Sequence, residues 1–330
     1  MLVVTGGGGF IGSVLAAALN DQSRSDLVIV DRFGHDEKWR NIAKRDFVEI
    51  VPVESLPAWL ERFGGEVDAI FHLGAISATT FSDADEIIAK NLNYSIALWR
   101  WCMAAKKPLI YASSAATYGD GAAGFDDSGG IAEFKRLKPM NLYGWSKHAF
   151  DLWALRQSAA GAAPPHWAGL KFFNVFGPNE YHKGDMMSLV AKNYRRVAAG
   201  EPIHLFKSHR PDYRDGEQLR DFIYVKDCVA AMLWLWRQGP SADHNGIYNI
   251  GSGEARSFLD LVKALGSACG RAPNIEFIDI PPEIRSNYQY FTEAKMSRLR
   301  QAGYNAPFTP LEAAVADFVS HHLAKPDPYL

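Results

Sequence analysis

Short apolar runs alternate with longer, helix-length segments through roughly the first half of the chain. The runs cover residues 2–5, 27–30, 69–73, 109–113 and 170–174, and each ends in small or polar residues. Strands of a parallel sheet are buried on both faces and read as continuous apolar runs, with a helix between successive strands. The pattern therefore predicts an α/β fold with a doubly wound parallel sheet.

The alternation loosens from about Gly177, where proline and charged residues become commoner and the apolar runs lie farther apart. One later run, residues 246–250, has the composition of another strand of the main sheet. We therefore expect residues 1–175 to form most of the sheet domain and residues 176–330 most of a smaller lobe. Because the strand near 246–250 returns to the sheet, the two parts are predicted to be interleaved.

A glycine-rich turn follows the first run directly, with Gly6, Gly9 and Gly12 ahead of a long apolar helix pattern. Glycines at this spacing allow a tight turn, close approach to a pyrophosphate and helix–strand packing, and the helix start offers free N–H groups. The segment predicts a Rossmann-type dinucleotide site in residues 1–175. The alternative interpretation is a glycine-rich hairpin or loop.

The second run ends in Asp31, roughly twenty residues after the last glycine, where an acidic side chain binds the adenosine ribose. Arg32 and Lys38 follow, and their charges would suit a 2′-phosphate, so NAD and NADP both remain open; the alternative for both cations is a solvated loop. Ligands lie beyond the carboxyl ends of such strands, which predicts a cleft at 74–75, 113–114 and Asn174. His72, inside its run, is interpreted as a core histidine.

Composition narrows the class of protein. The 330 residues are 48% hydrophobic with a formal net charge of −2, and no long basic run indicates nucleic acid or a membrane surface as a partner. No apolar stretch approaches the roughly 18 to 20 residues of a membrane span, so we expect a cytoplasmic protein. Cys102, Cys228 and Cys269 are widely spaced and predict neither disulfides nor a metal site.

Tyr143 and Lys147 are four residues apart at the start of a helix pattern predicted over residues 147–156, so they share one helical face. A nearby ammonium and a nicotinium charge lower the pKa of a phenol and make it a useful base. Ser114, at a strand end, is placed to donate a hydrogen bond to a reacting oxygen. The same spacing occurs by chance in many helices, but with the glycine turn it predicts a redox site.

These segments together resemble the extended short-chain dehydrogenase/reductase family: the 5–12 turn, Ser113-Ser114 with 117–119, and Tyr143-x-x-x-Lys147. The resemblance spans nearly the whole chain and implies an NAD(P)-dependent enzyme acting on a nucleotide sugar through oxidation to a ketone. Ala115 and Ala116 stand where dehydratases of the family carry an Asp-Glu pair, which argues against dehydration. The motifs and the resemblance assign the cofactor to Gly6, Gly9, Phe10, Ile11, Gly12, Asp31, Arg32, Lys38, Leu73, Gly74, Ala75, Ser77, Asn91, Tyr143, Lys147 and Val175.

A narrower resemblance, carried by residues 173–186 and 220–225, is to the heptose 6-epimerases of this family, which invert the exocyclic C6″ of an ADP-linked heptose used in lipopolysaccharide core assembly. It implies that Lys183 acts as a second acid/base beside Ser114, Tyr143 and Lys147. On the residues alone, an exposed loop lysine is the favoured interpretation of Lys183, and the resemblance reverses that preference. Rotation about the bond to an exocyclic carbon can turn the other face of the ketone toward the cofactor. The same rotation moves the carbonyl oxygen away from the first acid/base group, so a second group can serve the new oxygen position.

The resemblance further implies a set of substrate contacts. Residues 209–218 have no counterpart in the shorter family pattern and are interpreted as an inserted loop. Arg220 has a physical warrant because a guanidinium matches phosphate oxygens; its alternative is an ion pair with Asp221. The substrate set is Ser114, Asn174, Lys183, Asp185, Lys192, Phe206, Ser208, Arg220 and Tyr288.

The sequence thus predicts an epimerase with tightly bound NADP, NAD being the alternative, with an ADP-heptose as substrate, and the resemblance implies a homo-oligomer such as a pentamer. Two other interpretations stay open. One is a different nucleotide-sugar epimerase or ketoreductase, for example a 4-epimerase, with no catalytic use of Lys183. The other is a dinucleotide-binding scaffold without turnover.

Overall fold

The computed structural model describes residues 1–240, 242–285 and 288–330 and is built around a parallel sheet. The sheet has the strand order β10-β6-β5-β4-β1-β2-β3, and every neighbouring pair in it is parallel. This confirms the predicted α/β doubly wound fold. The strands are β1 (Leu2–Thr5), β2 (Leu27–Val30), β3 (Glu49–Val51), β4 (Ala69–His72), β5 (Leu109–Ser114), β6 (Trp167–Phe172) and β10 (Gly246–Ile250).

Alternate side chains of the strands feed two hydrophobic cores, one on each face of the sheet. In β1, Leu2 and Val4 join one core and Val3 joins the other, all with no exposed surface. This double burial explains why the strands read as unbroken apolar runs in the sequence. His72, in β4, is buried as predicted and hydrogen-bonds the hydroxyls of Thr5 and Ser95 at 2.7 and 2.9 Å.

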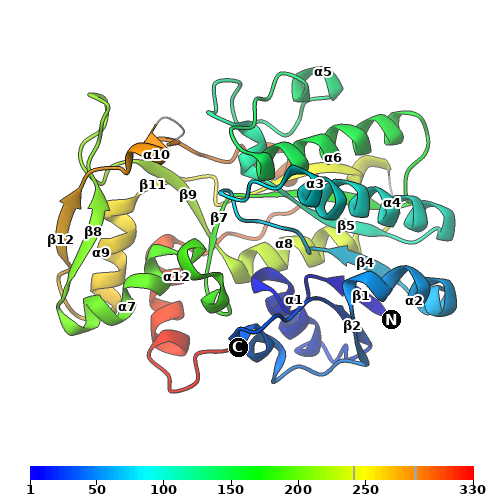
Figure 1. Ribbon diagram of the computed structural model, residues 1–330, viewed down its shortest axis with the longest axis horizontal. Helices are drawn as coiled ribbons and strands as arrows, with labels where there is room; N and C mark the ends of the chain where they lie inside the picture. The colour runs from blue at the N-terminus through cyan, green and yellow to red at the C-terminus, as the bar shows by residue number, and fades with distance from the viewer. Residues whose placement is uncertain (241, 286–287) are drawn as a thin grey trace.

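Helices cover both faces of the sheet, with α1 (Phe10–Asn20) and α8 (Val225–Arg237) on one side and α4 (Tyr94–Ala105) and α6 (Leu142–Ala159) on the other (Figure 1). Shorter helices complete these layers and the connections to them. They are η1 (Glu37–Ile42), η2 (Val53–Ser55), α2 (Leu56–Phe63), η3 (Gly64–Glu66), α3 (Ala84–Ile87), η4 (Ile88–Asn93), η5 (Ala115–Tyr118), α5 (Ile131–Phe134) and η7 (Ala242–His244).

The strand expected at 170–174 is shifted: β6 covers Trp167–Phe172, and Asn174 belongs to another strand. The chain leaves the central sheet at Phe173, whose N–H donates to the Ile250 carbonyl at 3.0 Å. It then enters β7 (Asn174–Phe176), which pairs with β9 (Leu219–Tyr224) in a separate three-stranded sheet. A single run in the sequence thus concealed a change of sheet, because Phe172 and Phe173 are both apolar and no turn residue separates the two strands. The strand β10 occupies the residues expected for it and pairs with β6.

A smaller lobe lies beside the main sheet, on the left of Figure 1. Its strands form the β11-β9-β7 sheet and the β12-β8 pair, and one hydrophobic core runs continuously from α1 into this lobe through α9 and α12. The two parts therefore share their packing. The elements are η6 (Tyr181–Met186), α7 (Leu189–Ala199), β8 (Pro202–Phe206), β11 (Ala255–Ser257), α9 (Phe258–Ala268), β12 (Asn274–Ile278), α10 (Pro282–Arg285), α12 (Leu311–Phe318) and η8 (Val319–Leu323). Helix α11 (Ser297–Gln301) packs against β10 of the main sheet.

Candidate functional site

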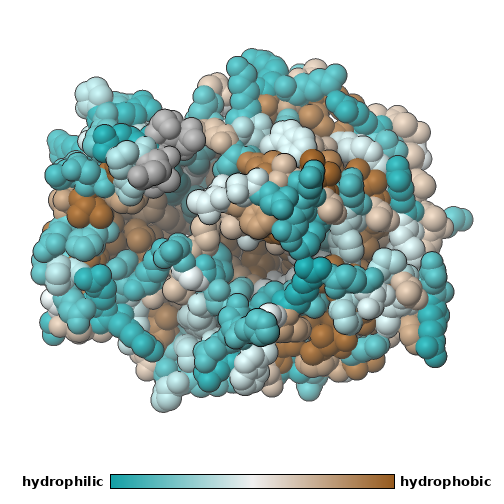
Figure 2. Space-filling model, in the orientation of Figure 1, coloured by the Kyte–Doolittle hydropathy of each residue, from teal (hydrophilic) through white to brown (hydrophobic). Residues whose placement is uncertain are grey.

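A cleft of about 820 Å³ opens beyond the carboxyl ends of β1, β4, β5 and β6. In the space-filling view a recess with apolar residues at its floor lies between the two parts of the molecule (Figure 2). Most of the predicted site residues line this cleft. They are Gly6, Gly9, Phe10, Ile11, Gly12, Asp31, Lys38, Leu73, Gly74, Ala75, Ser77, Ser114, Tyr143, Lys147, Asn174, Val175 and Lys183.

Two parts of the lining carry the side chains suited to acid/base chemistry, and we name them for the elements they come from. The helix wall is the end of β5 with the start of α6, and it holds Ser114, Tyr143 and Lys147. The loop wall is the segment 177–188 after β7, and it holds Lys183. The predicted bases thus reach one cleft from separate elements.

The glycine turn is close-packed in a way that only glycine permits. Gly6 has φ +69°, and a Cβ there would lie 2.6 Å from the Gly74 nitrogen. A Cβ on Gly12 would lie 2.2 Å from the Gly6 carbonyl oxygen. The first helical hydrogen bond of α1 runs from Ser13 N–H to Gly9, so the preceding N–H groups at the helix start have no acceptor within the helix. The turn fits a dinucleotide pyrophosphate.

Asp31 lies beside this turn and accepts hydrogen bonds from Gly8 N–H at 2.8 Å and from the Lys38 ammonium at 2.6 Å. Lys38 therefore lies in the cleft with the carboxylate that it partly neutralises. Arg32 does not line the cleft: its guanidinium pairs with Glu54, and both side chains are more than half exposed. The structure brings Asp31 and Lys38 together and leaves Arg32 on the outer surface.

Asn91 also lies outside the lining, although it was predicted to contact the cofactor. Its side chain is buried and holds the backbone of Ile76 by two hydrogen bonds, accepting from the N–H at 2.8 Å and donating to the carbonyl at 2.9 Å. It donates a third to the Ser146 hydroxyl at 3.1 Å. Asn91 therefore shapes the loop after β4 from behind.

On the helix wall, α6 begins at Leu142, five residues earlier than the predicted start, because Asn141 caps it by accepting from Gly144 N–H at 2.8 Å. Tyr143 and Lys147 thus lie one turn apart on a regular helix. The Lys147 ammonium donates to the Ala112 carbonyl of β5 at 2.8 Å. The Tyr143 and Ser114 side chains are hydrogen-bonded to each other, so the three predicted groups form one cluster.

The pKa values of this cluster differ from the sequence-based expectation. Burial raises the pKa of Tyr143, opposed by its hydrogen bond to Ser114 and reinforced by Asp151. Burial also lowers the pKa of Lys147 to about 8, while Asp151 opposes that change. In the protein alone, desolvation of the phenolate is thus the largest influence on the Tyr143 pKa. That Lys147 and a nicotinium charge together favour the phenolate stays a prediction for the protein with bound cofactor.

On the loop wall, Lys183 lies with its ammonium 4.9 Å from the centre of the Phe10 ring, at the start of α1. Burial lowers its pKa, and the nearby Glu180 carboxylate opposes the shift. Glu180 itself is fully buried and accepts from Gly177 N–H at 3.1 Å and from the Ser188 N–H and hydroxyl at 2.6 and 2.7 Å. This carboxylate spans the loop and sets its shape.

Three of the predicted substrate residues lie outside the lining of the cleft, in two separate segments. Asp185 and Lys192 lie at the mouth of the cleft, where Lys192 donates to the Asp185 carbonyl at 2.5 Å and both are exposed. Ser208 is in the loop after β8, where its N–H donates to Asp215 at 2.7 Å. Neither place contributes to the lining of the cleft.

Arg220, Tyr288 and Phe206 form a compact cluster next to the cleft. The Arg220 guanidinium is buried, 5.4 Å from the centre of the Tyr288 ring and 5.6 Å from that of Phe258, which lines the cleft. Tyr288 also contacts Phe206 edge to face at 5.8 Å. The alternative ion pair with Asp221 is wrong, because that carboxylate accepts from the N–H groups of Ser252, Gly253 and Ala294.

Several residues of the cleft carry no signal in the sequence. Met140, Met187, Phe258, Leu261, Gln289 and Thr292 line it but come from segments without a motif. Glu180 and Asn41 hold the loop wall without lining the cleft. Asn41 donates to the Gly8 carbonyl at 2.9 Å and lies 3.1 Å from the His182 Nδ1, a contact that no local pattern indicates.

Other classes of site find little support in the structure. Within residues 1–240, 242–285 and 288–330, no cluster of His, Cys, Asp or Glu side chains is arranged to hold a metal ion. No helix of this part of the chain is long and apolar enough to cross a membrane. Cys102 and Cys228 are buried, Cys269 is partly exposed, and all three are free.

Comparison with known proteins places this site in context. Residues 2–251 match the NAD dependent epimerase/dehydratase family. The chain is 48% identical, over the full length of both proteins, to ADP-L-glycero-D-manno-heptose-6-epimerase of Nitratidesulfovibrio vulgaris (strain DP4). The Helicobacter pylori protein of that name has a similar structure, with a TM-score of 0.76 and 27% identity over 97% of this chain and 95% of that one.

A second solved structure, the Thermus thermophilus UDP-glucose 4-epimerase in complex with NAD, is 25% identical, with a TM-score of 0.75 over 97% of this chain and 98% of that one. The glycine turn, the Ser114-Tyr143-Lys147 cluster and the family match agree with one another. The chain belongs to the NAD dependent epimerase/dehydratase family.

Proposed function

We propose that the protein interconverts ADP-D-glycero- and ADP-L-glycero-β-D-manno-heptose by inverting C6″ through a transient 6″-ketone. The observation that carries this proposal is the presence of Tyr143 and Lys183 in one cleft on two separate elements. The full-length likeness to proteins named ADP-L-glycero-D-manno-heptose-6-epimerase supports the same substrate.

In this proposal the helix wall serves the oxygen in its first position. Tyr143 removes the C6″ hydroxyl proton, and Ser114 donates a hydrogen bond that stabilises the developing charge on the oxygen. A bound nicotinamide supplies the redox chemistry, accepting a hydride and returning it. Lys147 orients the nicotinamide ribose, and its ammonium is held by the Ala112 carbonyl.

The loop wall serves the oxygen in its second position. Rotation about the bond to C6″ turns the other face of the planar ketone toward the site of hydride return and carries the carbonyl oxygen away from Tyr143. Lys183 then donates the proton that completes the inverted alcohol. Its pKa, lowered by burial, makes the ammonium a better acid than a solvated lysine.

The nucleotide part of the substrate is proposed to lie at the Arg220 cluster. Arg220 is buried, donates to the carbonyls of Leu219 and Gln289, and has two aromatic rings beside it. A guanidinium in such a setting suits a pyrophosphate, and the Tyr288 and Phe206 rings offer surface to the nucleoside. Asn174 lines the cleft and is paired in register with Phe222 of β9, two residues after Arg220, so it is proposed to contact the sugar.

The cofactor is a nicotinamide dinucleotide, and we propose that it is NADP, bound tightly, with NAD as the alternative. The support is Lys38, whose ammonium lies in the cleft 2.6 Å from Asp31 and offsets a charge that would repel a 2′-phosphate. Denaturing the purified protein and identifying the released dinucleotide by mass distinguishes the two. We further propose a cytoplasmic homo-oligomer, whose mass light scattering measures.

The decisive experiment incubates the purified protein, without added cofactor, with ADP-D-glycero-β-D-manno-heptose and follows the C6″ configuration by proton NMR. Appearance of the L-glycero epimer supports both the reaction and a retained cofactor. No conversion, even after addition of NADP or NAD, overturns the substrate assignment and favours another nucleotide sugar.

The two-base step has its own test. Lys183→Met should abolish epimerisation while retaining the bound cofactor and its reduction by substrate, because Tyr143 still serves the first oxygen position. Lys135→Met is the matched control, since Lys135 is an exposed lysine outside the cleft. Near-normal turnover by Lys183→Met favours an epimerase that acts within the sugar ring, such as a 4-epimerase.

A further inference from the structure

A fully buried ion pair lies behind the helix wall. The Asp151 Oδ2 of α6 and the Lys171 Nζ of β6 are 2.8 Å apart, and neither side chain has any exposed surface. Removing two charges from water costs several kcal/mol per ion before their attraction is counted. A pair in such a position therefore calls for an explanation in terms of what it contacts.

The pair joins the elements that carry the catalytic groups. Asp151 accepts a hydrogen bond from the Ser113 hydroxyl at 2.7 Å and from the Tyr111 hydroxyl at 3.1 Å, both on β5. Ser113 immediately precedes Ser114. Asp151 is also one helical turn after Lys147, which places both on one face of α6.

Lys171 closes the other side of the cluster. Its ammonium donates to the hydroxyl of Thr117, in the η5 segment that follows Ser114, and lies 4.8 Å from the centre of the Tyr118 ring. Helix α6, strands β5 and β6 and segment η5 thus meet at two opposite charges. The register between Ser114 and Tyr143 depends on this junction.

We propose that Asp151 is a positioning residue for the redox step, which holds the Ser114 end of β5 against α6 and serves as the counter-charge of the Lys147 ammonium. Lys171 offsets part of that negative charge and fixes the carboxylate in place. The proposal rests on the proposed function only in using Ser114, Tyr143 and Lys147 as the reacting cluster. It does not depend on which nucleotide sugar is the substrate.

The surrounding charges set the direction of the expected effect. Asp151 raises the pKa of Lys147, where it opposes the effect of burial. It also raises the pKa of Tyr143, where it adds to the effect of burial. Replacing the carboxylate by an amide therefore lowers both pKa values. The other titratable groups facing the junction or Lys147 are Tyr111 on β5, Tyr118 in η5, His148 on α6, His72 on β4, Lys171 on β6 and Asp127, which acts on Lys171.

The test compares Asp151→Asn with the wild-type holoenzyme. We expect kcat to fall about tenfold with little change in KM, and the alkaline limb of the pH profile of kcat, which follows Lys147, to move to lower pH by about half a unit or more. A readout independent of turnover is the titration of the Lys147 side chain by ¹³C NMR of lysine-labelled protein, assigned with Lys147→Met. Its midpoint should move in the same direction.

Asp227→Asn is the matched control. Asp227 is a partly buried aspartate of α8 whose carboxylate accepts from the Thr309 N–H and hydroxyl at 2.7 and 2.9 Å, away from the cleft. Asp227→Asn should lower the free energy of unfolding and leave the midpoint of the Lys147 titration unchanged. If Asp151→Asn does not fold, the double variant Asp151→Asn/Lys171→Met, which removes both charges of the pair, carries the test.

An unchanged Lys147 midpoint in a folded Asp151 variant overturns the proposal and leaves the pair a purely structural contact. A lowered midpoint supports it. Because the titration uses no sugar substrate, a failure of this proposal and a failure of the heptose assignment give separate results.

Discussion

The two walls of the cleft are built in different ways. The helix wall is made of regular elements: Lys147 is anchored to the Ala112 carbonyl of β5, and Asp151 and Lys171 join the elements behind it. The loop wall is a short 3₁₀ segment interrupted at Gly184, which has φ +53° and ψ −124°. The same cleft therefore combines a part whose geometry follows from the sheet with a part that specific side chains must hold.

The loop wall is held by contacts with the cofactor side of the molecule. Asn179, buried at φ +71°, donates to the Ser13 hydroxyl of α1 at 3.0 Å. Asn41 connects the Gly8 carbonyl of the glycine turn with His182, the neighbour of Lys183. The position of Lys183 thus depends on contacts of the loop wall with the glycine turn and with α1.

The largest expected effect is on the helix wall. Tyr143→Phe removes the base but keeps the ring, so we expect kcat to fall by about 10³-fold, within the range of general-base losses. The bound dinucleotide should remain, because the glycine turn is untouched. Turnover is measured by NMR and retained cofactor by absorbance of the purified variant.

Tyr94→Phe is a suitable control, since Tyr94 is a partly buried tyrosine outside the cleft whose hydroxyl donates to the Val53 carbonyl at 3.3 Å. It should stay within about twofold of wild type. Equal losses in the two variants would mean that the Tyr143 effect comes from packing and not from its hydroxyl.

The contrast between the walls also explains what could be predicted from the sequence. Strands such as β1, β2 and β10 and the Tyr143–Lys147 pair follow from local periodicity, because burial on two faces and a spacing of four are visible in neighbouring residues. The change of sheet at Phe173 is not visible in this way, because no turn residue separates β6 from β7. Nor was the raised pKa of Tyr143, which depends on burial by elements distant in sequence.

For the loop wall, the residues alone left Lys183 open between a base and a surface lysine. The contacts that hold it follow no sequence pattern. Asn41 and His182 are 141 residues apart, and the Glu180 carboxylate accepts from the N–H groups of Gly177 and Ser188 only because the chain turns around it. For Arg32 a local pattern misled: its place next to Asp31 in the sequence predicted a cofactor contact, but its side chain pairs with Glu54 outside the cleft.

The second prediction tests whether the loop wall needs its anchor. Glu180→Ala leaves the N–H groups of Gly177 and Ser188 without their acceptor, so we expect the free energy of unfolding to fall by about 2–4 kcal/mol. Displacement of Lys183 should lower kcat by between about tenfold and a hundredfold. Denaturant unfolding and the NMR assay measure the two effects.

Reduction of the bound cofactor by substrate should survive in this variant, because the helix wall is intact. Glu61→Ala, at an exposed glutamate of α2, is the control and should change neither quantity. Loss of the half-reaction together with epimerisation would show that the two walls are one unit.

The third prediction concerns pH. Because burial lowers the pKa of Lys147 to about 8, its ammonium is present below that value and lost above it. We expect kcat to fall about fivefold between about pH 8 and pH 9 as the proton leaves. The sign for stability is opposite: between the folded and unfolded pKa values the unfolded state binds the additional proton, so this group makes unfolding harder as pH rises.

The alkaline loss of activity should therefore occur in folded protein. A pH profile with circular dichroism recorded on the same samples tests this. Constant kcat up to about pH 9.5 would mean that Lys147 keeps its proton and that the helix wall is better solvated than the structure indicates.

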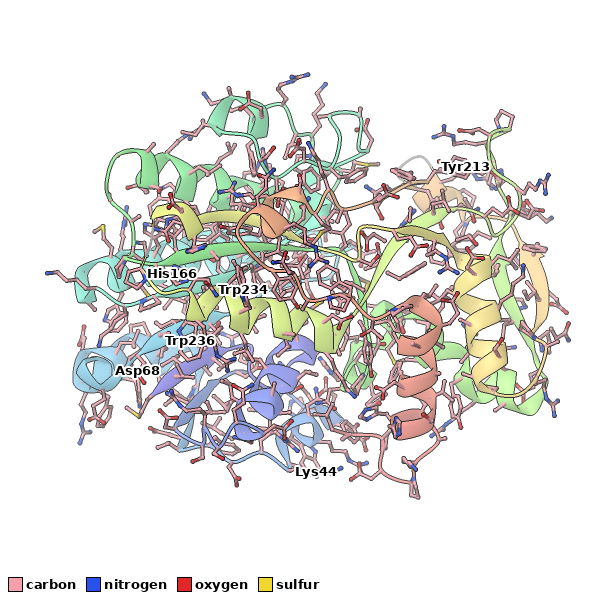
Figure 3. All side chains as sticks on the ribbon, turned by 180° about the vertical axis from the view of Figure 1, so that it is seen from behind. Lys44, Asp68, His166, Tyr213, Trp234 and Trp236 are labelled. Atoms are coloured by element: carbon pink, nitrogen blue, oxygen red, sulfur yellow. The ribbon has the colours of Figure 1, made fainter. Side chains whose placement is uncertain are left out.

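The smallest expected effect concerns the C-terminal residues 327–330, where an exposed ion pair can be compared with hydrogen bonds to the loop wall. Lys44, labelled in Figure 3, pairs with Asp327 at 2.8 Å, with side chains 44% and 58% exposed. Nearby, the Tyr181 hydroxyl donates to the Pro328 carbonyl at 2.9 Å and Leu330 N–H donates to the Asn179 side chain at 3.0 Å. The loop is thus attached to Pro328 and Leu330 by two hydrogen bonds, whereas the exposed ion pair connects Asp327 to the segment that follows η1.

Asp327→Asn should lower the free energy of unfolding by less than about 1 kcal/mol and change kcat by less than about twofold, since exposed ion pairs contribute little. Tyr181→Phe, which removes a partly buried hydrogen bond, should cost more, about 1 kcal/mol. Denaturant unfolding of both variants at low and high salt separates the two contributions. If Asp327→Asn had the larger effect, the exposed pair between Asp327 and Lys44, and not the hydrogen bonds to the loop, would hold residues 327–330 in place. The support that these residues give the loop wall would then depend on ionic strength.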